Sequence, residues 1–438
     1  MPDLQRPQRV CFIAYRGSMT CGGQGIYLYF LARELARLGI EVDVVVGPPY
    51  PDPMDFARSV QKLPNREHWA RWFTGDYPGM LPEGGAMAAL NPLNLYELGA
   101  SRLGFLPEPM AFSLRALRAL AQRLRTGERW DLIHDVQCLG YGVLGLKALG
   151  LPVVTTIHHP LSVDRRASLI RDQTLRDRIG SMAFYPVDMQ AFVARRVDRV
   201  FTSSEESARA IATDFRVNPN RIRNVLNGLD TDFFCPDQAV ERSETELLCV
   251  GRASDPNKGV RSLIRALAHL PEAITLTLVD NNHPDSEVFK WAREVGVGHR
   301  LNVTGRVEAD ALVNLYRRAA VTVVPSRYEG FGLPAVESMA CGTPVVACRV
   351  GALPEVMALC EGGLLVEKDS SPALAQGIKT LMRSSDQRRE LAERGRGRVE
   401  AHLSWRRVAS ATADGYAELL AERRGRPTST ITSDRPGQ

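Results

Sequence analysis

The sequence has no run of about 20 consecutive apolar residues, the length that a helix needs to cross a bilayer, so we expect no membrane-spanning segment. The first residues, MPDLQRPQRVCFIAY, lack the long apolar stretch of a signal peptide, and we expect none. The eight cysteines stand singly and form no C-x-x-C pair, which argues against a zinc site or a disulfide framework. They are typical of buried free thiols in a reducing compartment, and we therefore expect a cytoplasmic protein.

A strong excess of charge of one sign is also missing, since 55 Lys and Arg residues face 50 Asp and Glu residues. The net charge of +5 is too small and too dispersed to indicate a nucleic-acid partner, although it suits ligands that carry phosphate. Apolar residues make up 44% of the chain, which is ordinary for a globular protein. With 438 residues the chain exceeds the usual size of one hydrophobic core, which predicts two domains.

Short apolar runs alternate with helical patterns throughout the chain, which predicts the α/β class with parallel sheets. The first such unit is a strand at 9–15, a helix at 26–38 that Gly39 ends, and a strand at 41–47. Further strands of the first half are expected at 131–135, 152–158 and 199–204. The second half is expected to hold strands at 246–252, 275–280, 301–305, 321–326 and 343–348, with a helix at 260–270.

Turn-forming residues separate the two halves, and a polar segment rich in Pro, Gly, Ser and Thr ends the chain. These features predict an N-terminal Rossmann-like domain (1–203), a connector (204–243), a second Rossmann-like domain (244–403), a helix that crosses back to the first domain (404–423) and a disordered tail (424–438).

The segment 321–347 carries the clearest sign of a ligand site, because it reads strand, loop, helix and strand. Pro334 suits the first turn of the helix, and Gly342 marks its end. The preceding loop, which contains Glu329, therefore lies at the carboxyl edge of a parallel strand and before a helix N-terminus, where ligands and phosphates bind. Glu337 follows eight positions later, so both carboxylates can face one cleft.

The first strand of the second half supplies the opposite charge. Arg252 and Lys258 lie six positions apart in the loop GRASDPNKG. An arginine can hold phosphate oxygens in a bidentate manner, and a lysine adds a compact positive charge. Carboxylates for hydroxyl groups together with cations for a diphosphate are what a nucleotide sugar requires.

These motifs resemble the E-x7-E and R-x5-K patterns of the retaining glycosyltransferases of family 4, whose fold is GT-B, with two Rossmann-like domains that face across a cleft. Further similar segments are GGQGIYLYFLARELARLGIEVDVV at 22–45 and TTIHHP at 155–160. The resemblance extends from about residue 8 to about residue 420. The chain departs from the family at Gly351-Ala352, where a pair of glycines is common.

The resemblance implies roles for the charged residues. Glu329 would contact hydroxyl groups of the donor sugar near the reacting carbon, and Glu337 would hold the ribose. Arg252 and Lys258 would clamp the diphosphate and stabilise the departing nucleotide. The reaction would take place on one face of the sugar, with the leaving phosphate assisting deprotonation of the acceptor, so that no carboxylate nucleophile, metal or other cofactor is required.

The resemblance also implies a set of neighbouring donor contacts. Gly23 would approach the diphosphate, and His158 would lie beside the donor sugar and the acceptor. Backbone amides would bind sugar and phosphate, and these are assigned to Phe331, Gly332 and Leu333. One further loop would lie near the base, and it is assigned to Arg306 and Val307.

The implied activity is hexosyl transfer from a UDP- or GDP-sugar to an unknown acceptor in the synthesis of the cell envelope, a polysaccharide or a glycolipid. Two alternatives stay open. The first is another GT-B enzyme, either a nucleotide-sugar epimerase or a sugar-phosphate synthase. The second is a nucleotide-sugar-binding protein without turnover. A nicotinamide-dependent dehydrogenase is disfavoured, because the glycines at 22–25 do not spell G-x-G-x-x-G.

Three other features have two interpretations each. Asp230-Thr231-Asp232 matches a D-x-D metal motif but lies in a turn, and we predict a turn and no metal. His134 ends a core strand, which favours a structural role. The segment 113–125 is a basic amphipathic helix, which is either an ordinary surface helix or a peripheral contact with the inner face of the membrane.

Overall fold

The computed structural model describes residues 5–19, 23–64, 91–171, 174–280, 283 and 286–425. Cys21 and almost all of the predicted tail lie outside the described residues. The chain divides into two compact units. Unit 1 consists of residues 1–156, 192–200 and 409–438, and unit 2 consists of residues 157–191 and 201–408. The domain boundaries predicted from the sequence stay a prediction.

The first sheet has seven strands in the order β3-β2-β1-β4-β5-β6-β7. Strand β1 pairs in parallel with both β2 and β4. The strands are β1 (Arg9–Ala14), β2 (Glu41–Val46), β3 (Ser59–Lys62), β4 (Leu132–Val136), β5 (Val153–Thr156), β6 (Arg199–Thr202) and β7 (Ile222–Asn224). The helices of this part are α1 (Gly23–Arg37), α4 (Pro92–Arg102), α5 (Glu108–Arg125), α6 (Tyr141–Ala148), α7 (Leu161–Arg171), α8 (Leu175–Phe184), α9 (Val187–Ala194) and α10 (Glu205–Asp214).

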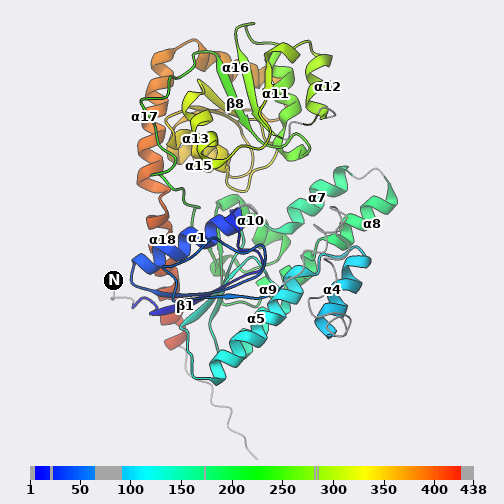
Figure 1. Ribbon diagram of the computed structural model, residues 1–438, viewed down its shortest axis with the longest axis vertical. Helices are drawn as coiled ribbons and strands as arrows, with labels where there is room; N and C mark the ends of the chain where they lie inside the picture. Colours follow the sequence, from blue (N-terminus) through cyan, green and yellow to red (C-terminus); the bar gives the residue numbers. More distant parts are fainter. Residues whose placement is uncertain are drawn as a thin grey trace, which may run out of the picture. The chain divides into compact units, whose positions relative to one another are not determined.

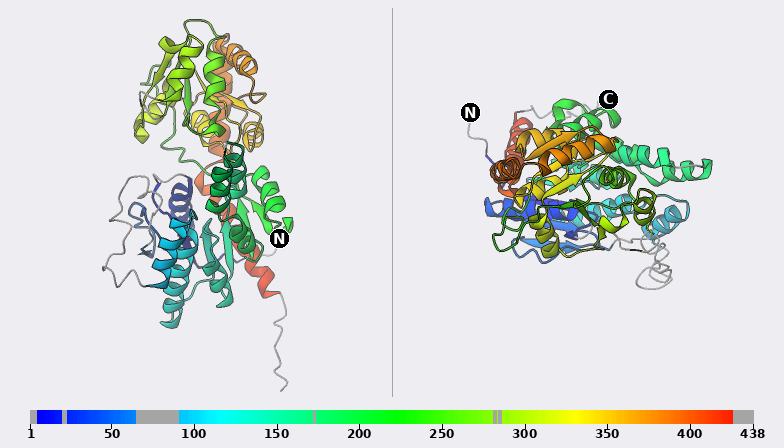
Figure 2. Two further views of the ribbon diagram at one scale, coloured as in Figure 1. Left: turned by 90° about the vertical axis from the view of Figure 1, so that its right-hand side faces the viewer. Right: turned by 90° about the horizontal axis from the view of Figure 1, so that it is seen from above.

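The second sheet has six strands in the order β10-β9-β8-β11-β12-β13. These are β8 (Glu246–Val250), β9 (Thr275–Val279), β10 (Leu301–Val303), β11 (Val321–Val324), β12 (Val345–Cys348) and β13 (Gly363–Val366). The helices are α11 (Val260–Leu267), α12 (Glu287–Glu294), α13 (Ala309–Arg318), α14 (Leu333–Ala340), α15 (Leu353–Cys360), α16 (Ser371–Met382), α17 (Ser385–His402) and α18 (Trp405–Arg424). Helices cover both faces of each sheet (Figures 1 and 2).

The order of the second sheet creates a topological switch point between β8 and β11. After β8 the chain forms β9 and β10 on one side of β8, and it then crosses over to form β11 on the other side of β8. Helix α11 packs beside α12 and α16, and α17 contacts α14, α15 and α16. Loops after β8 and β11 therefore lie next to each other at the carboxyl edge, which is the usual ligand position in such sheets.

The central strands of both sheets are largely apolar on both faces, which favours their burial between helices. All four residues of β11 are buried, including Thr322. Helix α11 is strongly amphipathic, and its Leu263, Ile264 and Leu267 are fully buried against the second sheet. Each such side chain contributes about 1.5–3 kcal/mol through burial. The parallel α/β class predicted from the sequence is confirmed.

The predicted end of the first helix is also confirmed. Helix α1 ends at Arg37, and Gly39 adopts a φ of 84°, which glycine tolerates without strain. The Ile40 amide then donates to the Leu35 carbonyl at 3.1 Å and closes the helix. The sequence did not predict β3, β7 or β13. These strands are mostly half-buried, and β3 and β7 contain several polar residues, so they lack an apolar run.

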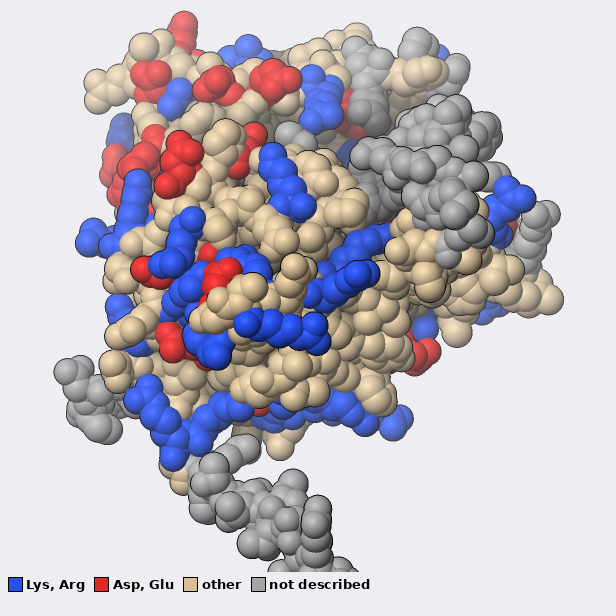
Figure 3. Space-filling model, turned by 60° about the horizontal axis from the view of Figure 1, so that its bottom comes forward, with Lys and Arg blue, Asp and Glu red and all other residues tan. Residues whose placement is uncertain are grey.

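The predicted basic amphipathic segment lies in α5, whose apolar face is covered within unit 1. Phe112, Ala116 and Leu120 are fully buried. Two of its arginines are bound to carboxylates, because Arg115 pairs with Glu97 and Arg123 pairs with Glu128. These contacts favour the surface-helix interpretation, and contact with a membrane stays a prediction. Figure 3 shows basic side chains spread over one face of the molecule, with uncharged and some acidic residues between them.

His134 has the buried, hydrogen-bonded surroundings of a structural histidine. Its Nε2 lies 2.7 Å from Thr156 Oγ1, and its Nδ1 lies 2.5 Å from the hydroxyl of Tyr416, in the part of α18 that belongs to unit 1. Nearby in the same unit, Arg199 forms ion pairs with Glu418 and Glu422 of α18. Within the described ranges, no helix combines the length and apolarity that crossing a bilayer would take.

Candidate functional site

The loops after β8 and β11 pack directly against each other at the switch point of unit 2. The first loop includes a short 3-10 helix, Pro256–Lys258, followed by Gly259 with a φ of 62°. A Cβ atom on Gly259 would lie only 2.0 Å from the Pro325 carbonyl oxygen, so only glycine permits this approach. The Arg327 amide donates to the Asn257 carbonyl at 2.7 Å and ties the loops together.

This packing brings together Lys258 and Glu329, two residues that the sequence motifs singled out. Lys258 Nζ donates to Glu329 Oε1 at 2.7 Å, and the side chains are 28% and 9% exposed, respectively. Ser326 Oγ donates to the same carboxylate oxygen at 2.8 Å. A hydroxyl and an ammonium group thus fix one oxygen of Glu329 in place. The arrangement sets a carboxylate and a cation side by side at the edge of the sheet.

The backbone of Glu329 is held by the segment that follows β12. The Ala352 amide donates to the Glu329 carbonyl at 3.0 Å. A Cβ atom on Gly351, which has a φ of 52°, would lie 2.1 Å from that carbonyl oxygen. Ala352 has an ordinary helical backbone with a φ of −80°. The Gly-Ala sequence therefore keeps the glycine that this contact needs, and the second position tolerates alanine.

Glu337 lies on α14, and its Oε2 accepts a hydrogen bond of 2.7 Å from the hydroxyl of Tyr316, which is fully buried on α13. Burial raises the pKa of Glu337 to about 7, although the Tyr316 hydrogen bond opposes this change. The charges of Lys258 and Glu329 also act on its pKa, with opposite signs. The ion pair therefore acts electrostatically on Glu337, whose role as a ribose contact stays a prediction.

The start of α14 presents the predicted backbone amides. Gly332 precedes the helix with a φ of 89°, and a Cβ atom there would lie 2.6 Å from Leu353 Cδ2. Leu333 is the first helical residue, and first-turn amides have no partner inside a helix. The side chain of Phe331 is 5% exposed and packs in the core. The start of a helix can bind an anion, and the predicted contacts of these amides with a donor stay predictions.

Arg252 follows β8, and its side chain is exposed. The loop that carries it is fixed by Asp280, whose Oδ2 accepts from the Ala253 amide at 2.8 Å. Arg306 and Val307 lie between β10 and α13, exposed and half-buried, respectively. Their predicted contacts with a donor stay predictions.

His158 belongs to unit 2, and its backbone lies beside the loop of Glu329. A Cβ atom on Gly330 would lie 3.7 Å from the His158 carbonyl oxygen, which also accepts from Ser207 Oγ at 3.0 Å. Burial, together with the neighbouring His159, lowers the pKa of His158 to about 3, so its imidazole is neutral at physiological pH.

Gly23 begins α1 in unit 1. A Cβ atom placed on Gly23 would have no neighbouring atom within 4 Å. The predicted approach of Gly23 to the diphosphate stays a prediction.

Sequence reasoning missed three residues that hold the site, namely Ser326, Tyr316 and Asp280. Asp280 follows β9 at the same edge of the sheet, so its position in TLTLVD could have indicated it. Nothing in the sequence links Tyr316 to Glu337.

The turn predicted at Asp230-Thr231-Asp232 is formed. Asp230 Oδ1 accepts hydrogen bonds from the amides of Asp232 and Phe233, both at 3.3 Å.

Family models match most of the chain. The family described as Glycosyltransferase Family 4 matches residues 21–233, and the family described as Glycosyl transferases group 1 matches residues 232–398. The MMP alpha-(1->4)-mannosyltransferase of Mycolicibacterium hassiacum is 36% identical over 94% of this chain and 98% of that protein. The D-inositol 3-phosphate glycosyltransferase of Acidothermus cellulolyticus is 31% identical over 98% of this chain and 94% of that protein.

Solved structures share the fold. Sucrose-phosphate synthase from Thermosynechococcus elongatus superposes with a TM-score of 0.68 at 24% identity, over 95% of this chain and all of that chain. HepE from Anabaena, solved in complex with UDP and glucose, gives a TM-score of 0.63 at 17% identity, over 95% of this chain and 99% of that chain. At these identities the likeness establishes the GT-B fold and nothing about the ligand.

Proposed function

The chain belongs to glycosyltransferase family 4 and is a hexosyltransferase, and we propose that it transfers the hexosyl group of a UDP- or GDP-sugar to an acceptor hydroxyl with retention of configuration. The observation that carries this proposal is the contact of 2.7 Å between Lys258 and Glu329. The bond that breaks joins the sugar to the diphosphate. A carboxylate for sugar hydroxyls and a cation for phosphate must therefore lie next to each other, as this pair does.

The chemistry of the site supports charge stabilisation as its main contribution. Lys258 and Arg252 would neutralise the diphosphate as it departs, aided by the amides at the start of α14. Glu329 is already bound by Lys258 and Ser326, which suits a residue that orients hydroxyl groups rather than a nucleophile. The departing phosphate would take the acceptor proton on the same face of the sugar. No metal is needed in this scheme.

The neutral imidazole of His158 suits a position between the sugar and the acceptor. A cation there would oppose the positive charge that develops on the sugar as its bond to phosphate breaks. Because the pKa of His158 is lowered to about 3, the group stays uncharged in the working range of pH. One ring nitrogen can then donate a hydrogen bond, and the other can accept one.

For the transferred sugar and the acceptor, we infer mannosyl transfer to the 4-hydroxyl of a sugar residue. The support is the relative named as an alpha-(1->4)-mannosyltransferase, which is 36% identical over nearly the whole chain. An α-linked product arises with retention from an α-configured donor. Relatives named D-inositol 3-phosphate glycosyltransferases are 27–31% identical, and they make an inositol phosphate the second candidate acceptor.

We also propose a cytoplasmic location, because the seven described cysteines are free thiols and six are buried.

The experiment is an incubation of the protein with GDP- and UDP-hexoses, separately with short α-(1→4)-linked mannose oligosaccharides and with D-inositol 3-phosphate, with and without EDTA. Mass spectrometry identifies the product, and NMR gives its anomeric configuration. We expect one donor family to yield an α-linked product regardless of EDTA. An inverted product would overturn retention, and conversion of the donor sugar without an acceptor would favour an epimerase.

A further inference from the structure

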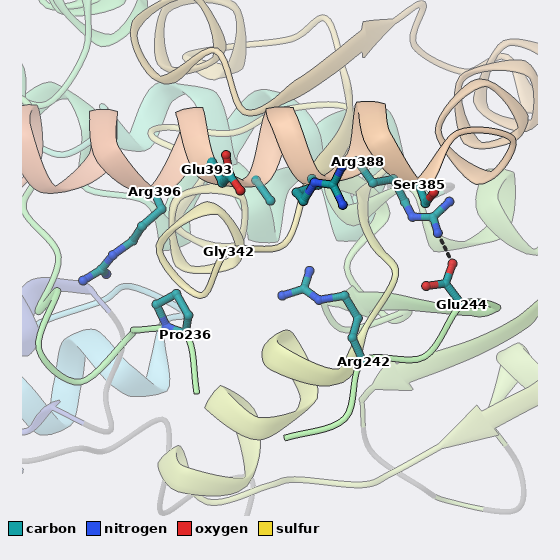
Figure 4. A pocket seen from close by; sticks show the side chains of 10 residues that line it. Pro236, Arg242, Glu244, Gly342, Ser385, Arg388, Glu393 and Arg396 are labelled. Carbon is teal, nitrogen blue, oxygen red and sulfur yellow. Dashed lines mark hydrogen bonds and ion pairs between the residues drawn. The ribbon is translucent and has the colours of Figure 1, made fainter. Parts of the chain in front are cut away.

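A pocket of about 450 Å³ lies in unit 2 at the edge of the second sheet opposite the Lys258–Glu329 pair. Helix α17 borders it on one side, and the segment leading to Glu244 and the turn at Gly342 border it on the other (Figure 4). Glu244 precedes β8 and Gly342 precedes β12, so the pocket lies at the amino edge. Lys258 and Glu329 follow β8 and β11, at the carboxyl edge. A strand of this length separates the two edges by roughly 17 Å.

The lining of this pocket is basic, with four arginines against two glutamates. Three of the arginines have carboxylate partners. Arg388 pairs with Glu244, Arg389 pairs with Asp386 at 2.6 Å, and Arg396 pairs with Glu400. Arg388 and Arg396 also donate to backbone carbonyls, which makes them part of the scaffold.

The fourth arginine, Arg242, differs in its partners. Its Nη1 donates to Thr343 Oγ1 at 3.0 Å, and within the described residues it takes part in no ion pair. Figure 4 shows Arg242 reaching from the connector toward α17. Although the side chain is exposed to solvent in the pocket, partial burial lowers the pKa of Arg242, the Arg388 charge acts in the same direction, and the Glu244 charge opposes it. An anion in the pocket would offset the repulsion between Arg242 and Arg388.

We propose that this pocket binds a small molecule that carries a phosphate group. The planar guanidinium of Arg242 can bind two phosphate oxygens at once, and Arg389 can supply a second cation from α17. A volume of about 450 Å³ suits a ligand of the size of a phosphorylated sugar. The site is separate from the donor site and goes beyond the proposed transfer reaction.

A continuous path of contacts connects this pocket with the donor side of the sheet. Arg242 donates to Thr343 Oγ1, which in turn donates to the Tyr316 carbonyl at 2.6 Å. The hydroxyl of the same tyrosine donates to Glu337, the proposed ribose ligand. A ligand that pulls Arg242 away from Thr343 would loosen α13 and change donor affinity. This second part of the proposal rests on the proposed function, whereas the binding of phosphate does not.

Isothermal titration calorimetry with inorganic phosphate, and separately with a hexose 6-phosphate, tests the binding. The variants are Arg242→Gln and Arg389→Gln, with Arg394→Gln on the same helix as the matched control because it does not line the pocket. We expect roughly tenfold weaker binding in the first two and unchanged binding in the control. The side chain of Arg389 is 69% exposed, so we expect Arg389→Gln to fold normally. This variant therefore tests phosphate binding even if Arg242→Gln is poorly folded.

A double variant, Arg252→Ala with Lys258→Ala, separates the two anion sites. We expect it to keep the phosphate binding that depends on Arg242. If phosphate binding vanishes in this double variant but survives in Arg242→Gln and Arg389→Gln, the phosphate binds at the donor site. That result would overturn the proposal of a second phosphate site and would not contradict the proposed function. If inorganic phosphate binds and the hexose 6-phosphate does not, the ligand of this pocket is free phosphate.

The KM for the donor, measured with and without saturating hexose 6-phosphate, tests the coupling. We expect a change of about threefold or more in the wild type and none in Arg242→Gln. An equal KM under both conditions, with binding confirmed, would overturn the coupling.

Discussion

Lys258 and Glu329 are separated by 71 positions, yet their side chains meet at 2.7 Å. They meet because β8 and β11 are neighbours in the second sheet and both strands end at the same edge. Gly259 and Gly351 permit the close packing that this contact requires. The ion pair is thus a direct consequence of the strand order, and it supplies the two chemical groups that a sugar diphosphate needs.

Removal of either charge should lower turnover far more than stability. We expect Glu329→Gln and Lys258→Ala each to reduce kcat by roughly a hundredfold, because a charged contact to a transition state contributes ~2–4 kcal/mol. Glu367→Gln, an exposed change in the same unit, is the control and should leave kcat unchanged. Steady-state kinetics and circular dichroism measure both effects. Near-normal turnover in either variant would remove the role assigned to that residue.

The stability difference between Glu337→Gln and the wild type should depend on pH. Burial raises the pKa of Glu337 from 4.5 to about 7, so the folded state binds this proton more tightly than the unfolded state. The free energy of unfolding of the wild type therefore falls, through this group, as pH rises from about 4.5 through about 7. Glutamine resembles the protonated form at every pH, so the Tm of the variant relative to wild type should rise over this range and then level off.

Tyr316→Phe should move the same midpoint to higher pH, because the Tyr316 hydrogen bond lowers the pKa of Glu337. Differential scanning fluorimetry across the range measures both variants. A constant offset between Glu337→Gln and wild type would contradict a raised pKa.

Gly351→Ala should disturb the site through the backbone. Its φ of 52° and the contact of 2.1 Å between a Cβ atom and the Glu329 carbonyl predict a loss of ~1–3 kcal/mol in the free energy of unfolding and a displaced Glu329. Gly397→Ala is the matched control, since Gly397 lies in helix α17 with nothing within 4 Å of its Cβ position. That change should stabilise by ~0.5–1 kcal/mol. Equal kcat and stability in both variants would refute the steric argument.

His158 should contribute no step to the pH profile of the reaction. Its pKa, lowered to about 3, keeps the imidazole neutral from pH 6 to pH 9. His158→Asn should therefore lower kcat by a similar factor at every pH in that range, and the two profiles should run parallel. A step near pH 6.5 that disappears in the variant would show that His158 titrates during the reaction.

The sequence predicted the strands that are buried on both faces, because their apolar runs are continuous, as in β8 and β11. It also placed Glu329 and Lys258 at strand ends, since a parallel sheet collects such ends at one edge. Strand β3, with the sequence SVQK, has no apolar run and could not be found in this way.

The partners of the site residues could not be predicted either. Tyr316 reaches Glu337 only because α13 and α14 pack side by side, and no local pattern encodes that contact. The same holds for Arg242, whose position beside α17 depends on the path of the connector. The sequence shows Gly351 only as part of a departure from the family, because its contact with the Glu329 carbonyl depends on the packed loops.

The most direct test of a nucleotide-sugar site at Lys258 and Glu329 is calorimetric titration of UDP, GDP and their hexose conjugates. The titrations use the wild type and the double variant Arg252→Ala with Lys258→Ala, each with and without EDTA. We predict that one nucleotide family binds the wild type, that EDTA has no effect, and that the double variant binds at least about tenfold more weakly. Binding that is undiminished in the double variant, or no binding of any nucleotide, would contradict the account.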